Sequence, residues 1–64
     1  MAAADKAAID KAVAEGQAAT AGTDGDAMMN AFTAIANAED QAKASMKAYT
    51  ELTATYDSLQ AQYD

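Results

Sequence analysis

The chain has 64 residues, with ten acidic side chains against four Lys, and its formal net charge is -6. This charge opposes binding to nucleic acid or to an anionic membrane surface, and the absence of Cys and His removes disulfides, thiolate chemistry and the usual zinc ligands. Pro is absent and all three Gly lie in the first 25 residues, so the sequence predicts an all-α protein.

The first predicted helix covers about residues 3–21. Ile9 and Val13 lie four residues apart on one face of it. Gly16 continues the same face, where Gly costs about 1 kcal/mol relative to Ala in an exposed helix but lets another backbone approach closely. The sequence leaves open whether this helix frays after Glu15 or packs tightly at Gly16.

A turn is predicted over residues 22–26. Gly22 suits a left-handed C-cap of the first helix, and Thr23, Asp24 or Asp26 suits the N-cap of the next one. A connection this short favours antiparallel helices, so the predicted fold is a single-domain helical hairpin over residues 1–64.

The acidic turn also resembles the opening of a calcium loop. Counted from Asp24, however, Met29 stands where such a loop needs Gly, and Ile35 stands where it needs a bidentate acid. We therefore expect an acidic helix cap and no metal site.

The second predicted helix runs from about residue 27 to about residue 63, roughly 55 Å, against about 27 Å for the first. Its larger apolar residues recur at steps of three and four, which gives one apolar stripe. The first helix reaches only to about Ser45, so the rest of the stripe is expected to pack against another molecule. The predicted interface consists of Met28, Phe32, Ile35, Met46, Tyr49, Leu52, Tyr56, Leu59 and Tyr63.

This stripe is irregular in the middle of the second helix. Glu39 occupies a position between Ile35 and Ala42 where an apolar residue is expected. A bend over residues 37–40 would explain this, and a full break there would give a compact three-helix bundle instead of the hairpin. The sequence does not decide between a continuous and a broken helix.

Catalysis is not expected from this composition. The sequence has no His, Cys or Arg, and the adjacent acids Glu39 and Asp40 point about 100° apart on a helix. We therefore predict no catalytic, cofactor-binding or metal-binding residue. No apolar run approaches the roughly 18 residues of a membrane span, and the start of the chain lacks the pattern of a cleaved signal peptide.

Two kinds of function would bury the uncovered stripe. The chain could assemble with copies of itself, into a filament if the contact is head-to-tail or into a dimer or four-helix bundle if it is isologous. Alternatively, it could be a small adaptor that docks on a different helical protein.

The segment Gly25-Asp26-Ala27-Met28-Met29-Asn30-Ala31-Phe32, followed by Tyr49 in an Ala-, Thr-, Asp- and Gln-rich chain, resembles the needle and pilus subunits of type III secretion systems. The resemblance implies a leaderless, exported subunit that polymerises into a hollow tube, mainly through its second helix. We therefore expect a structural, self-assembling subunit of a secreted or cell-surface bacterial filament. The alternative is a cytoplasmic helical-hairpin adaptor or secretion cochaperone.

Overall fold

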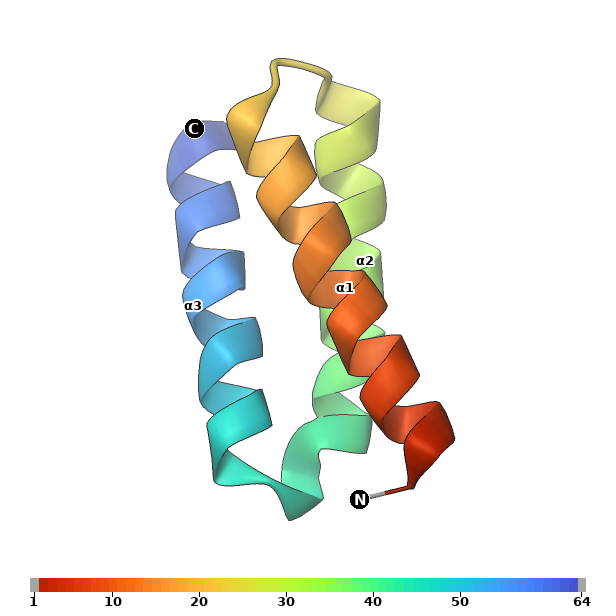
Figure 1. Ribbon diagram of the computed structural model, residues 1–64. Helices are drawn as coiled ribbons and strands as arrows, with labels where there is room; N and C mark the ends of the chain where they lie inside the picture. The colour runs from red at the N-terminus through yellow and green to blue at the C-terminus, as the bar shows by residue number, and fades with distance from the viewer. Residues whose placement is uncertain (1, 64) are drawn as a thin grey trace.

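The computed structural model describes residues 2–63 and shows three α-helices joined by short connections (Figure 1). α1 spans Ala3–Ala21, α2 spans Gly25–Gln41 and α3 spans Met46–Tyr63, with a 3₁₀ turn, η1, at Ala42–Ala44. α1 and α3 run in one direction and α2 runs in the other, which gives a bundle with principal-axis extents of 33 × 17 × 14 Å. The prediction of an all-α protein is confirmed.

The predicted continuous helix over residues 27–63 is wrong, because it is divided into α2 and α3. The break lies a few residues beyond the predicted bend, at Ser45, whose φ of -136° and ψ of 107° are extended rather than helical. Ser45 also caps the start of α3, because its Oγ accepts a hydrogen bond from the backbone N–H of Ala48 at 3.4 Å. The chain is therefore a three-helix bundle and not a hairpin with a long second arm.

Burial of the C-terminal apolar residues explains why the chain reverses at Ser45. Leu52 and Leu59 both have 0% of their surface exposed, as does Ile35 on α2. Each Leu contributes about 1.5–3 kcal/mol when buried, whereas each interrupted helical hydrogen bond forfeits only about 0.5–1.5 kcal/mol. α1 and α2 of the same chain thus cover much of the stripe that was expected to need another molecule.

Small residues fill much of the space between the helices. Gly16 is buried, and a Cβ built on it would lie 2.5 Å from Thr55 Cγ2 on α3 and 3.0 Å from Ile35 Cδ1 on α2. α1 continues through Ala21, so Gly16 marks a close helix contact rather than a frayed end. The apolar core consists of Ile9, Ala12, Val13, Ala19, Met28, Ala31, Ile35, Ala38, Ala42, Leu52 and Leu59.

The turn between α1 and α2 is a helix cap, as the sequence predicted. The carboxylate of Asp24 accepts hydrogen bonds from the backbone N–H groups of Asp26 at 2.9 Å and Ala27 at 3.3 Å. The left-handed C-cap predicted at Gly22 is wrong: its φ is -107°, although its N–H still donates to the carbonyl of Ala19 at 3.2 Å. The chain leaves α1 in an extended conformation that requires no positive φ.

None of the helices within residues 2–63 combines the length and the apolar content that crossing a membrane requires.

Candidate protein-docking surface

The nine residues of the predicted interface divide into three groups. One group lies in the core of the bundle and consists of Met28, Ile35, Leu52 and Leu59. Phe32 and Tyr56 are partly buried against that core. Met46, Tyr49 and Tyr63 are exposed, with 76%, 37% and 50% of their surface accessible. The stripe is therefore mostly an intramolecular surface, and only part of it is available to a partner.

Phe32 brings two of the three Tyr side chains, Tyr56 and Tyr63, together on the α2–α3 pair. Its ring centroid lies 5.1 Å from that of Tyr56 and 5.7 Å from that of Tyr63, with interplanar angles of 63° and 86°. Both contacts are edge-to-face, the arrangement that aromatic quadrupoles favour. Tyr56 and Tyr63 can both reach Phe32 because they lie seven residues apart on α3 and so share one face.

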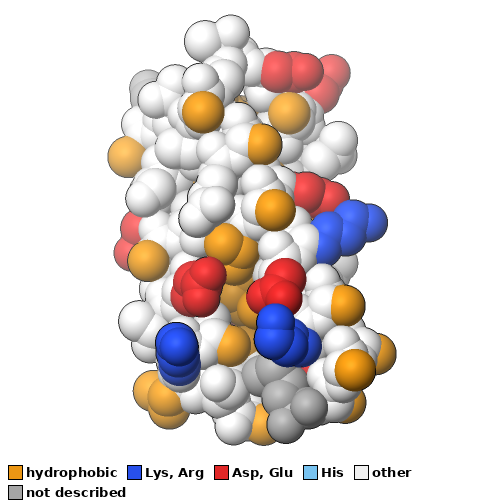
Figure 2. Space-filling model, in the orientation of Figure 1, with side chains coloured by type: hydrophobic (Ala, Val, Ile, Leu, Met, Phe, Trp, Pro, Cys, Tyr) orange, Lys and Arg blue, Asp and Glu red, His pale blue; other side chains and the backbone are white. Residues whose placement is uncertain are grey.

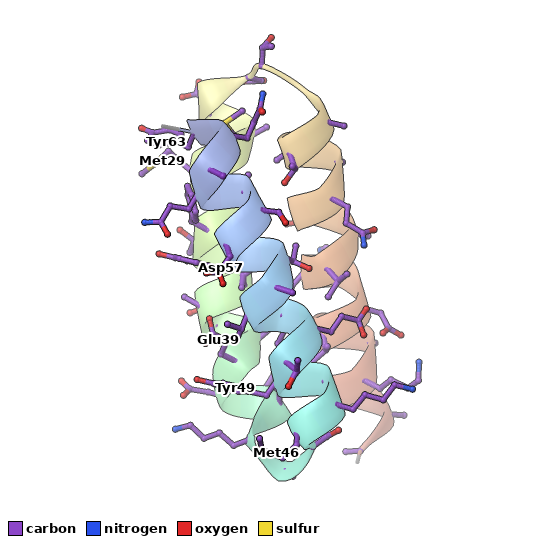
Figure 3. All side chains as sticks on the ribbon, turned by 90° about the vertical axis from the view of Figure 1, so that its left-hand side faces the viewer. Met29, Glu39, Met46, Tyr49, Asp57 and Tyr63 are labelled. Carbon is purple, nitrogen blue, oxygen red and sulfur yellow. The ribbon has the colours of Figure 1, made fainter. Side chains whose placement is uncertain are left out.

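Met29 extends this aromatic cluster on the α2 side. It precedes Phe32 by three residues, which puts the two on adjacent turns of one helix face, and 52% of its surface is exposed. Figure 3 shows Met29 and Tyr63 at the same end of the α2–α3 pair, away from Met46. We call Met29, Phe32, Tyr56 and Tyr63 the α2–α3 patch.

The half of the bundle that carries the α2–α3 patch contains acidic side chains and no Lys. α1 and α3 begin at the opposite end, and α2 and η1 return to it, so every Lys falls in the other half. Those four residues are Lys6, Lys11, Lys43 and Lys47. Among residues 2–63, the acids in the half with the patch are Glu15, Asp24, Asp26 and Asp57. On the face drawn in Figure 2, the upper end carries red acidic side chains and no blue one, whereas red and blue side chains lie together at mid-height and below.

Ion pairs are confined to the half that contains the Lys residues, within the described part of the chain. Lys6 Nζ donates to an Asp10 carboxylate oxygen at 2.7 Å, and Lys43 Nζ lies 3.2 Å from Asp40 Oδ1. The hydrogen bond from Lys6 to Asp10 raises the pKa of Lys6 above its ordinary value. All four side chains are well exposed, so these are surface pairs of small energetic weight.

No known family model, curated protein or solved structure matches this chain.

Other surface features offer less to a partner or a ligand. A shallow hollow between α1 and α2 is lined mainly by small side chains, with Glu15 and Asp24 at its margin. Across residues 2–63, no three acidic side chains gather closely enough to hold a metal ion. The α2–α3 patch groups two exposed side chains, Met29 and Tyr63, with the partly buried Phe32 and Tyr56, and a second exposed pair, Met46 and Tyr49, lies on α3 toward the other end.

The predicted interface set contains three of the four patch residues but not Met29, although Met is a residue type that suits an adaptable interface. Alternating steps of three and four along the stripe select Met28, which is buried with 4% exposure, and pass over its neighbour. The spacing of three residues between Met29 and Phe32 is the sequence feature that indicates a shared helix face. It points to Met29 only when Met28 is assigned to the core.

Proposed function

We propose that this chain is a non-catalytic helical adaptor that binds another helical protein through the α2–α3 patch. The observation that carries the proposal is the edge-to-face contact of Phe32 with Tyr63 on two helices that are fixed by the core, where Tyr63 and Met29 both remain about half-exposed. Aromatic residues and Met are enriched in protein interfaces, and side chains held on helices lose little conformational freedom on binding.

The three-helix architecture supports an adaptor more than a polymer subunit. The filament prediction rested on the resemblance to type III secretion needle subunits and on a long second helix whose stripe had no partner within the chain. Leu52 and Leu59, which belong to that stripe, are completely buried by the chain itself. The apolar surface that remains is small at either end, which suits the docking of one partner.

Photo-cross-linking in the native host tests this proposal. A photoreactive benzoylphenylalanine at position 63 should give a discrete adduct with another protein, whereas the same group at Ala14, exposed on α1, should not. The adduct should weaken with Met29→Gln and persist with Met46→Gln, because Met46 is exposed at the other end of α3. Equal adducts at positions 63 and 14, or insensitivity to Met29→Gln, would reject the adaptor proposal.

A self-assembling subunit of a secreted filament is the second candidate. A head-to-tail polymer needs two different surfaces on each subunit. Met46 and Tyr49 lie toward one end of the α2–α3 pair, and Met29 and Tyr63 lie toward the other, so the chain exposes apolar side chains at both ends (Figure 3). Electron microscopy of the purified protein decides this candidate, since a polymer gives extended particles.

A further inference from the structure

We infer that the partner which docks on the α2–α3 patch is a basic amphipathic helix of another protein. This inference rests on the proposed adaptor function and adds the chemistry of the partner. It follows from the shape of the patch, the charge around it and the cost of covering it with a second copy.

The patch has the layout of a site for a helix. Tyr56 and Tyr63 are seven residues apart on α3, a rise of about 10.5 Å at 1.5 Å per residue. Met29 and Phe32 run along the neighbouring antiparallel helix, so the apolar side chains follow the seam between α2 and α3. A helix laid along this seam can present apolar residues at i, i+3 or i+4 and i+7, as in helix-in-groove recognition.

The negative charge beside the patch favours a basic partner. Asp26 precedes Met29 by three residues on α2, and Asp57 follows Tyr56 directly on α3. Neither acid has a salt-bridge partner within residues 2–63, and the four Lys lie in the other half of the bundle. Lys or Arg on the flanks of a docked helix would meet these carboxylates, whereas acidic flanks would be repelled.

A second copy of the chain fits this surface poorly. Isologous pairing through the patch would bring together two chains that each carry a net charge of -6. It would also bring Asp26 and Asp57 of one chain near the same acids of the other. Like charges placed together across an interface cost free energy, so the patch favours a partner of opposite charge.

Titration of the isotope-labelled full chain with synthetic peptides, followed by amide chemical shifts, tests this inference. The probe is an amphipathic helix with Leu along one face and Lys elsewhere. One control peptide has Glu in place of every Lys, and the other has the same Leu and Lys residues in scrambled order. At low salt, the basic amphipathic peptide should shift the amides around Phe32 and Tyr63, and both controls should bind more weakly.

Matched substitutions then separate the apolar and the electrostatic contributions. Met29→Gln should weaken binding of the basic peptide about fivefold to tenfold, and Met46→Gln should change it by less than about twofold. Asp57→Asn should weaken binding about twofold to threefold at low salt and have no effect at high salt, where the charge is screened. Asp40→Asn removes the same charge at the other end and should leave binding nearly unchanged.

Several results would overturn the inference while leaving the adaptor proposal standing. These are tighter or equal binding of the acidic peptide, equal binding of the scrambled peptide, shifts spread over α1, or no binding of the basic peptide. Displacement of the peptide by self-association of the chain at the patch would also overturn it. The adaptor proposal itself is tested separately: it fails if cross-linking at position 63 gives no specific protein adduct, or an adduct that Met29→Gln does not weaken.

Discussion

Gly16 and Thr55 lie against each other where α1 crosses α3, so closely that a Cβ on Gly16 would come within 2.5 Å of Thr55 Cγ2. Thr55 has little freedom to move aside, because its Oγ1 donates a hydrogen bond to the carbonyl of Glu51 at 2.9 Å. The contact therefore fixes the separation of the two helices.

Gly16→Ala should destabilise the bundle despite the higher helix propensity of Ala. Overpacking a close contact costs about 1–3 kcal/mol, and the propensity gain offsets at most about 1 kcal/mol of this. We expect a net loss of up to about 2 kcal/mol in the free energy of unfolding, measured by urea denaturation. An increase in stability together with higher helicity would show that the two helices are not in close contact there.

The same contact predicts a rescue by Thr55→Ser. Removing Thr55 Cγ2 alone should cost about 1 kcal/mol, because a buried methyl group is lost. In the background of Gly16→Ala, however, the removal relieves the clash, so the double variant should be more stable than the sum of the single changes predicts. Strict additivity in this double-mutant cycle would contradict the proposed contact.

Leu59→Ala tests whether α3 packs on the core. Leu59 is completely buried, so truncation should cost about 2–5 kcal/mol and leave a chain of this size largely unfolded at room temperature. Met46→Ala, at a site with 76% exposure, should change stability by less than about 0.5 kcal/mol. Comparable effects of the two substitutions in denaturation experiments would mean that α3 is not anchored as described.

Asp24→Ala should destabilise the start of α2. Its carboxylate accepts two backbone N–H groups, and loss of such an N-cap costs about 1 kcal/mol. Thr23→Ala is the matched control, because Thr23 is exposed and Asp24, not Thr23, is the N-cap residue. If Thr23→Ala lowered the melting temperature more than Asp24→Ala, Thr23 and not Asp24 would be the N-cap residue.

The local features of this fold could be predicted from sequence because each depends on neighbouring residues. Helix content follows from the Ala-rich composition, and the cap at Asp24 follows from an acid just before an apolar helix. The close contact at Gly16 was one of two alternatives, and only the packing of α1 against α3 decides it.

The break at Ser45 could not be predicted in the same way. The residues around it include no Gly or Pro, and the run Ala42-Lys43-Ala44 favours a continuous helix. What interrupts the helix is the burial of Leu52 and Leu59 in the same core as Ile35, which is a tertiary effect. Once the chain reverses there, four of the nine predicted interface residues become core and two more pack against it, and the candidate site contracts to the α2–α3 patch.

Whether one chain covers its own apolar stripe is tested most directly by thermal melts over an approximately hundredfold range of protein concentration, with sedimentation equilibrium on the same samples. The three-helix bundle predicts the mass of a single chain and a melting midpoint that does not depend on concentration. A midpoint that rises with concentration, together with a mass of two or more chains, would contradict it. That result would mean that the stripe is shared between chains, as a self-assembling subunit requires.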